Sequence, residues 1–210
     1  MAARGTLRAT SPEQVWQLEV VLSDSEPPIW RRLRVLGSTP LHSLHLILQH
    51  AFGWTNSHLY QFEIGDRRFA QPDPEDAYSE NPPQDARRFR LQDLGFEQGS
   101  EFAYIYDFGD WWKHRIHVEA VSQVEIKEKY PCCVGGARAG PPDDCGGVHG
   151  YHELLAALAN PRHPEHPQWS EWVPSDFDPE AFSAEDTTRT LQRLHGKARR
   201  RARRTTAKWS

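Results

Sequence analysis

The chain has 210 residues, enough for one large domain, and its 38% hydrophobic content with eight Trp and nine Phe can supply a core. Its formal charge of −4 conceals an acidic body and a basic end: residues 189–210 hold nine Lys or Arg and no acid, whereas the other 188 residues carry 16 basic and 29 acidic side chains. This division excludes a uniformly basic nucleic-acid binder, and no apolar run approaches the roughly 20 residues of a membrane helix.

The start of the chain lacks the apolar stretch of an export signal, and the number of cysteines, three, is odd. The sequence therefore predicts a cytoplasmic protein with reduced thiols and no membrane partner. We expect a flexible leader over residues 1–13, a single domain over 14–195 and a basic, disordered tail over 196–210.

The first elements follow from hydrophobic spacing. Alternation over residues 16–22 and 29–36 predicts an antiparallel strand pair, with Arg32 and Arg34 on a solvated face. A helical stripe then runs to Phe52, with Thr39 as the expected N-cap and Gly53 as the C′ residue. Three polar residues of this helix are expected on a solvated face: His42, His45 and Gln49.

Two hairpins follow along the chain. Residues 58–64 and 67–69 flank the turn signal Gly65-Asp66, and residues 102–106 and 112–118 flank a second turn. Residues 71–89 are rich in Pro and acids, which predicts a surface loop. In the second hairpin, His114 falls on the apolar face, whereas Lys113, Arg115 and His117 share the other face, which we expect to be solvated.

The remaining chain is Gly-rich and then helical. Residues 130–150 contain too little apolar content to order themselves, so the sheet, a metal ion or both must hold them. Helices are expected over 151–158 and 164–173, and a last one after the capping box that begins at Ser183. The pattern predicts a single α+β domain with antiparallel β-hairpins packed against a few helices.

All three cysteines lie in the Gly-rich segment, with histidines just after them. Three thiolates and one imidazole would suit tetrahedral zinc, and the candidate ligands are Cys132, Cys133, Cys145 and His149. The chain has no Cys-x-x-Cys pair, which is the strong zinc signature. The alternative is that the thiols are free and structural in a packed loop.

Acidic residues bracket the turns of the same region. Asp107, Asp110 and Asp144 sit where an Asp commonly caps its own turn, so a purely structural role is one interpretation. The other is that both turns converge on His114 and Tyr151, where an Asp–His pair could serve acid/base chemistry or metal binding. His58 fits the pattern of a core histidine. The catalytic candidates are therefore Asp107, Asp110, His114, Asp144 and Tyr151.

The basic tail could contact nucleic-acid phosphates without sequence preference. Its candidate residues are Lys197, Arg199, Arg200, Arg201, Arg203 and Arg204, and Arg31, Arg32 and Arg34 form a second small basic cluster. The alternative is a tail that only keeps the protein soluble.

Several spaced motifs together resemble the plasmid pRiA4b ORF-3-like family over about residues 14–195. They include Pro27-Pro-Ile-Trp-Arg-Arg32, Gly53-Trp54, Tyr106-Asp-Phe-Gly-Asp110, Pro141-Pro142 with Asp144, and Gly146-Gly147. The resemblance implies a compact α+β domain and a plasmid or mobile-element association, and it brings no reaction with it. Many relatives have a Cys just before the Pro-Pro pair, where this chain has Gly140.

Two functions follow from these residues. The first is a binding or adaptor protein with a central pocket and a tail that contacts nucleic acid. The second is a metal-dependent enzyme that uses the region of Asp107, Asp110, His114 and Asp144. Zinc is the expected cofactor of a metal site, and the sequence leaves open whether the protein is an enzyme.

Overall fold

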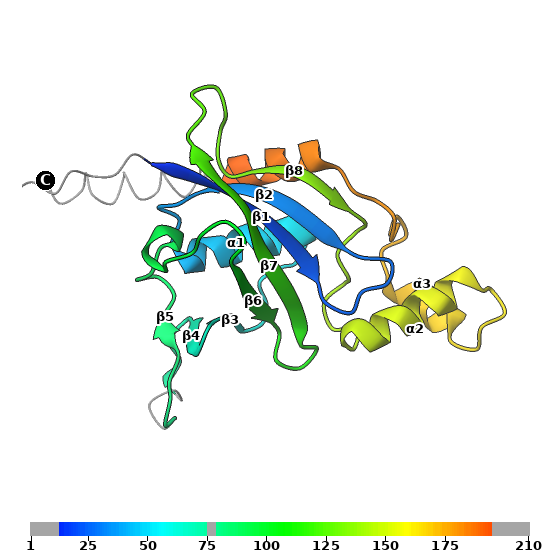
Figure 1. Cartoon of the computed structure of the whole chain (residues 1–210). Helices are drawn as coiled ribbons and strands as arrows, with labels where there is room; N and C mark the ends of the chain where they lie inside the picture. The colour runs from blue at the N-terminus through cyan, green and yellow to red at the C-terminus, as the bar shows by residue number, and fades with distance from the viewer. Residues whose placement is uncertain (1–12, 75–78, 195–210) are drawn as a thin grey trace, which may run out of the picture.

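The computed structural model describes residues 13–74 and 79–194 (Figure 1). Residues 1–12 of the expected leader and the expected tail at 196–210 lie outside this part of the chain. Within it, no helix is both long enough and apolar enough to cross a membrane.

One eight-stranded sheet forms the centre of the molecule. Its strands are β1 (Gln14–Leu22), β2 (Trp30–Leu36), β3 (Tyr60–Ile64), β4 (Arg67–Ala70), β5 (Gln84–Asp85), β6 (Glu101–Tyr106), β7 (Trp112–Gln123) and β8 (Cys132–Ala137). The spatial order is β5-β4-β3-β6-β7-β1-β2-β8, and every pair is antiparallel except β4 with β5. The predicted pair and both predicted hairpins are confirmed. So is the fold class, a single α+β domain.

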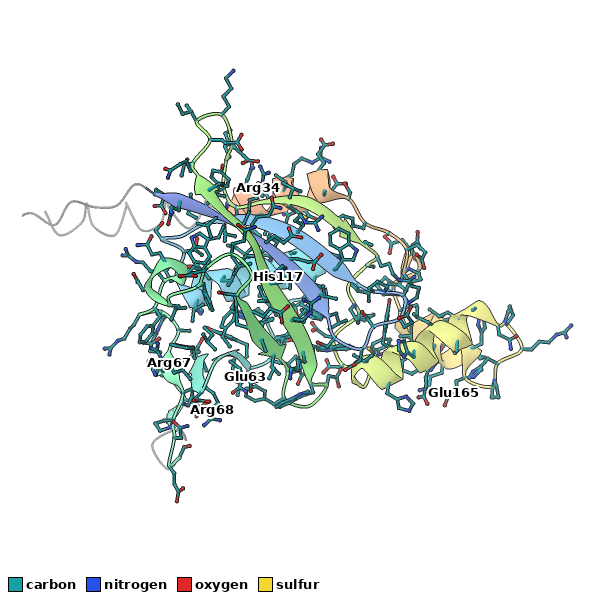
Figure 2. The ribbon with its side chains drawn as sticks, viewed as in Figure 1. Arg34, Glu63, Arg67, Arg68, His117 and Glu165 are labelled. Carbon is teal, nitrogen blue, oxygen red and sulfur yellow. The ribbon has the colours of Figure 1, made fainter. Side chains whose placement is uncertain are left out.

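Alternation along the strands divides the sheet into an apolar and a charged face. Leu18, Val20 and Leu33 are fully buried on the apolar face. On the other face Arg32 pairs with Glu119 at 2.6 Å. Arg34 and His117 are labelled over this charged face in Figure 2. The solvated face expected of β2 and β7 is therefore present, and its arginines are paired with acids.

Helix α1 (Leu41–Phe52) packs against the apolar face of the sheet. Pro40, not Thr39, is its N-cap, and Gly53 takes the predicted left-handed C-terminal conformation with φ of 87°. The expected solvated face is wrong at His45 and Gln49, which are 1% and 0% exposed. Both side chains contact the hydroxyl of Tyr104, a residue of β6, so the sheet satisfies their polarity.

The Gly-rich segment is less irregular than expected because β8 lies within it and pairs with β2. Pairing with the sheet therefore orders residues 132–137 of this segment. After β8 come α2 (Gly147–Ala159), which begins four residues before the predicted start, and α3 (His166–Trp172). A further helix covers residues 184–194 of the described chain, and Ser183 caps it by accepting a hydrogen bond from the Asp186 amide at 3.1 Å. The 3-10 turn η2 (Leu91–Asp93) closes the long loop after β4.

Candidate functional site

Two turns that lie far apart in sequence meet at one end of the sheet. The amide of Gly146, just before α2, donates to Oδ2 of Asp110 in the β6–β7 turn at 3.2 Å. At Gly147, where φ is 67°, a Cβ atom would lie 2.4 Å from the Asp110 carbonyl oxygen. Only glycine tolerates both this backbone conformation and this close approach. The two turns meet, but the histidine between them is His58, whereas convergence on His114 and Tyr151 was expected from the sequence.

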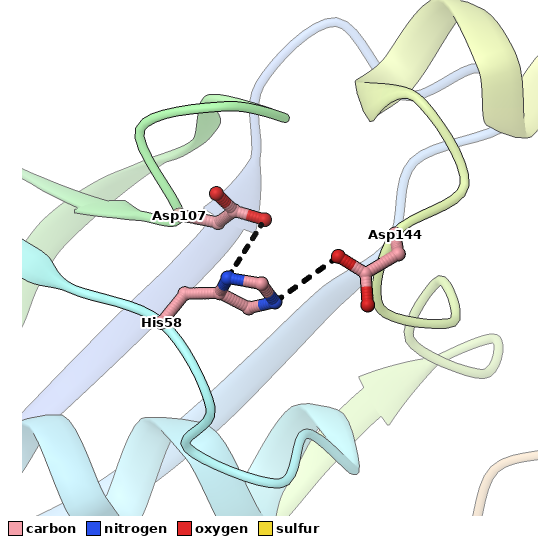
Figure 3. A group of neighbouring side chains, drawn as sticks. All are labelled: His58, Asp107 and Asp144. Carbon is pink, nitrogen blue, oxygen red and sulfur yellow. Dashed lines mark ion pairs between the residues drawn. The ribbon is translucent and has the colours of Figure 1, made fainter.

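His58, Asp107 and Asp144 form the resulting cluster (Figure 3). Nδ1 of His58 lies 3.6 Å from Oδ2 of Asp107, and its Nε2 lies 3.2 Å from Oδ1 of Asp144. One potential ligand atom from each residue falls within 4.8 Å of the others. The Asp107 and Asp144 side chains are 10% and 70% exposed, so the cluster is enclosed on one side and open to solvent on the other.

Asp107 is fixed by its own turn. Its amide donates to the Leu59 carbonyl at 2.9 Å, and its Oδ1 accepts a hydrogen bond from the Gly109 amide at 2.8 Å. Oδ2 is left facing His58 at a distance too long for a hydrogen bond. Nε2 of His58 is shielded from solvent and has no hydrogen bond of acceptable geometry among the described residues. The three side chains therefore do not satisfy one another's hydrogen-bonding capacity.

Further acids surround the cluster. Asp143 accepts a hydrogen bond from Oγ1 of Thr55 at 2.9 Å. Its other oxygen, Oδ1, is shielded from solvent and unpaired within the described chain. None of Asp107, Asp110, Asp143 and Asp144 forms an ion pair with a Lys or Arg among the residues that the structure describes. The concentrated negative charge favours the approach of a cation.

A buried polar network fixes the loop that carries His58. Nε2 of His45 lies 2.6 Å from Oδ1 of Asn56, and the Asn56 amide donates to Oε1 of Gln49 at 2.9 Å. The Ser57 amide donates to the Tyr106 hydroxyl at 3.2 Å. Burial lowers the pKa of His45 to about 3, so its ring is neutral at physiological pH. The core thus orients the loop up to His58 without adding charge.

Three of the predicted catalytic residues lie at or beside the cluster: Asp107 and Asp144 within it, and Asp110 in the adjoining turn. His114 is fully buried in the core, and its Nδ1 lies 3.0 Å from the Trp112 carbonyl oxygen. Burial lowers the His114 pKa to about 3 and raises the pKa of Tyr151, which is 2% exposed, to about 12. Neither residue belongs to the cluster.

Sequence reasoning missed His58 because it was grouped with the core histidines. The signal that could have found it is strand pairing. Tyr60 of β3 lies opposite Tyr106 of β6, so the residues just before β3 and just after β6 are neighbours. That pairing joins segments more than 40 residues apart, and local periodicity does not specify it.

The predicted zinc ligands are not brought to one point. Sγ of Cys132 contacts Oε1 of Glu128 at 3.6 Å, and Sγ of Cys133 contacts the Gly135 carbonyl at 3.3 Å. Neighbouring residues of a strand point in opposite directions, which separates these two thiols. His149 lies on the surface with 88% of its side chain exposed, 3.4 Å from Glu153. Within the described chain, the group of three or more gathered ligands is the His58 cluster.

Burial raises the pKa of Cys132 and of Cys145 to about 12, and acids nearby contribute in both cases. Both groups are therefore thiols at neutral pH, which fits the structural interpretation of the cysteines.

The predicted basic residues separate into two groups. Lys197, Arg199, Arg200, Arg201, Arg203 and Arg204 lie outside the described residues. Arg31 is buried with 3% exposure, whereas Arg32 and Arg34 pair with acids on the charged face of the sheet. The small cluster expected at residues 31–34 therefore does not present a basic surface.

Comparisons with known proteins give a consistent result. The family model described as "Plasmid pRiA4b ORF-3-like protein" matches residues 14–186. The chain is 39% identical over 194 residues to uncharacterized protein y4hQ of Sinorhizobium fredii, covering 91% of this chain and 98% of that protein. It is also similar to the crystal structure of MM3350, a protein of unknown function from Methanosarcina mazei. The TM-score is 0.76 at 30% identity, over 84% of this chain and 98% of that one.

The structure explains why this chain has Gly140 where many relatives have a Cys before the Pro-Pro pair. A Cβ atom at this position would lie 2.0 Å from the carbonyl oxygen of Phe52, at the end of α1. A cysteine here would therefore require the loop or the helix end to move. The close contact instead holds the loop before Pro141 against α1, with Nε1 of Trp54 donating to the Pro141 carbonyl at 2.8 Å.

Proposed function

The chain belongs to the plasmid pRiA4b ORF-3-like family, and we propose that it is a metal-dependent enzyme whose single divalent cation is bound by His58, Asp107 and Asp144. The observation that carries the proposal is the approach of these three side chains from separate segments to within 4.8 Å of one another. This is the metal-dependent function expected from the sequence, with His58 in the place of His114.

The donor set favours a particular kind of ion. Two carboxylates and one imidazole suit Mg²⁺, Mn²⁺, Fe²⁺ or Zn²⁺ better than a thiol-selecting ion. Opposite ligands of an octahedral ion with bonds near 2.0–2.1 Å lie about 4 Å apart. Adjacent ligands lie about 3 Å apart, and the two carboxylates face different nitrogens of the His58 ring, so binding one ion requires the side chains to close around one of these nitrogens from a spacing of up to 4.8 Å.

The number of ligands favours catalysis over a structural role. Structural sites are usually closed by four protein ligands, whereas three leave positions for water and substrate. The 70% exposed Asp144 side chain lies on the side from which both could enter. A divalent cation held by these three side chains would lower the pKa of a bound water molecule, so hydrolysis is the reaction class that we propose.

The metal site is tested by titrating Mn²⁺ into the purified protein after EDTA treatment, with calorimetry and electron paramagnetic resonance as readouts. We expect one Mn²⁺ per chain, and His58→Ala or Asp144→Asn should weaken binding by about tenfold or more, because each removes one of three ligands. Affinity should fall at acid pH, since the ligands must be deprotonated to bind. His149→Ala is the matched control, because this exposed histidine also lies beside an acid.

Two other results would contradict this assignment. If no divalent ion binds, His58 is only an imidazole held between two carboxylates. If the purified protein contains zinc that persists in His58→Ala but is lost in Cys145→Ala, the cysteine set predicted from the sequence is the metal site.

Catalysis is tested separately with p-nitrophenyl acetate and bis(p-nitrophenyl) phosphate, which report ester and phosphodiester hydrolysis. We expect Mn²⁺-dependent release of p-nitrophenol by the wild-type protein and none above background by His58→Ala. Equal rates in the two proteins would contradict a hydrolytic role for the cluster.

A further inference from the structure

An open groove of about 750 Å³ begins at Asp143, next to the His58 cluster, and runs between the end of α1 and residues 174–187. Asp143, next to Asp144, lies at the cluster end, together with Trp54. The Trp54 ring packs on Tyr106 at 4.9 Å, and Tyr106 packs on the His58 ring at 5.8 Å. The Tyr106 ring therefore connects Trp54 of the groove to His58 of the cluster.

The lining of the groove is mostly apolar and aromatic. Phe52, Trp54, Pro142, Phe177 and Phe182 contribute to it. A concave apolar surface with few polar groups is typical of small-molecule sites, in which the polar groups set orientation and specificity.

The polar group of interest in this groove is the guanidinium of Arg31. Its Cζ atom lies over two aromatic rings, 4.8 Å from the centre of the Phe52 ring and 4.5 Å from the centre of the Phe182 ring. Nε donates to the Ala51 carbonyl at 2.7 Å, and Nη1 donates to the carbonyls of Trp30 and Ala137 at 2.8 and 2.9 Å. Nη2 has no hydrogen bond among the described residues.

Arg31 is a buried positive charge that no described carboxylate balances. The residue is 3% exposed and forms no ion pair within the described chain, unlike Arg32 and Arg34 on the same strand. Burial lowers its pKa to about 10, which leaves it charged at neutral pH. A buried charge without a counter-ion costs free energy that a bound anion would recover.

Two acids line the groove, and they have different partners. Asp186 pairs with Arg189, and Asp143 accepts its hydrogen bond from Thr55 near the cluster. Neither forms an ion pair with Arg31, so no acid of the groove compensates the positive charge of Arg31, and the negative charge of Asp143 lies at the cluster end of the groove.

We propose that the groove binds a small organic anion with an apolar body, whose acidic group pairs with Nη2 of Arg31 and whose body lies on the aromatic lining toward the His58 cluster. Carboxylate, sulfonate and phosphate share the chemistry that Arg31 recognises. If the anion is the substrate of the His58 cluster, the proposal rests on the proposed function. Binding of the anion in the groove does not require a cation at the His58 cluster.

Two fluorescent probes of nearly equal shape test the pairing: the anion 8-anilinonaphthalene-1-sulfonate and its neutral analogue N-phenyl-1-naphthylamine. Each is titrated in EDTA against the wild-type protein. We expect the sulfonate to bind more tightly, and Arg31→Gln to weaken it about tenfold or more while leaving the neutral probe nearly unchanged. Arg67→Gln is the control, since Arg67 also lies over two aromatic rings but outside the groove.

A second variant covers the case in which Arg31→Gln fails to fold. Ala181 is an exposed residue of the groove wall, and Ala181→Trp should block both probes without changing Arg31. Equal affinity of the two probes for the wild-type protein, or sulfonate binding unaffected by Ala181→Trp, would overturn the proposal. If the sulfonate binds and Mn²⁺ does not, only the proposed cation site is rejected. If Mn²⁺ binds and the sulfonate does not, only the proposed groove site is rejected.

Discussion

At the scale of single residues, two buried histidines make the free energy of unfolding depend on pH. His45 and His114 are 1% and 0% exposed, and burial lowers the pKa of each to about 3. The unfolded chain, in which a histidine has a pKa near 6.5, therefore binds these protons more readily than the folded one. Their contribution to stability is complete above pH 6.5 and is lost as the pH falls from 6.5 toward 3.

The substitution His45→Gln tests this dependence. Between pH 7 and pH 5 each buried histidine should remove about 2 kcal/mol from the free energy of unfolding, at about 1.4 kcal/mol per pH unit below 6.5. The loss of stability over this interval should therefore be about 2 kcal/mol smaller in His45→Gln than in the wild-type protein. Urea unfolding at both pH values measures it, with His149→Gln as the exposed control. An identical loss in His45→Gln and wild type would contradict the burial argument.

At the scale of elements, the contact between the β6–β7 turn and the start of α2 assembles the cluster. The two adjacent glycines at this contact both have positive φ, 89° at Gly146 and 67° at Gly147. They differ in the space around them. A Cβ atom at Gly147 would lie 2.4 Å from the Asp110 carbonyl oxygen, whereas at Gly146 the nearest atom would be 3.6 Å away. Asp107 and Asp144 are held near each other by this close approach.

Gly147→Ala should therefore separate the turns, and Gly146→Ala should not. Both substitutions carry backbone strain on the order of 1 kcal/mol, because an alanine disfavours positive φ. Only Gly147→Ala adds the clash, so we expect it to weaken Mn²⁺ binding by about tenfold or more beyond the control. Calorimetry measures the affinities, and urea unfolding measures the common strain. Equal Mn²⁺ affinity in the two variants would show that the turn contact does not build the site.

At the scale of the whole molecule, charge is divided between an acidic body and a basic end. The nine Lys or Arg of residues 189–210 contrast with the excess of acids in the other 188 residues. The binding or adaptor function predicted from the sequence, with a tail that contacts nucleic acid, stays a prediction. The acidic cluster near His58 would itself repel a duplex, so contact is expected through the tail alone.

Removal of residues 196–210 tests the tail. The full-length chain should bind a short DNA duplex weakly at 50 mM salt, and its affinity should fall steeply by 200 mM, since six to ten phosphate contacts cost on the order of 10³-fold or more over this range. The truncated chain should show no binding at either concentration by fluorescence anisotropy. Unchanged affinity after truncation would show that the tail does not bind DNA and would favour a solubilising role.

Local patterns in the sequence were sufficient for much of the fold. Alternation and turn signals placed every strand from β1 to β7 except the two-residue β5, which lies in the loop predicted over residues 71–89, and helical spacing with Gly53 placed the end of α1. These predictions succeeded because the information is local: neighbouring side chains decide which face of an element is apolar. The short strand β8 was missed because its Gly-rich segment has no such pattern, and only its pairing with β2 makes it a strand.

By itself, the sequence determined the α+β class, the hairpins, the division of charge and the acids of the two turns. Only the tertiary structure decided that His58 joins Asp107 and Asp144, that His45 and Gln49 are buried against Tyr104, and that Arg31 is buried in the wall of an aromatic groove. The reason is physical. The site is assembled by the pairing of strands that are distant in sequence and by glycines that allow two backbone segments to touch. Neither the pairing nor the backbone contact can be read from the sequence next to each site residue.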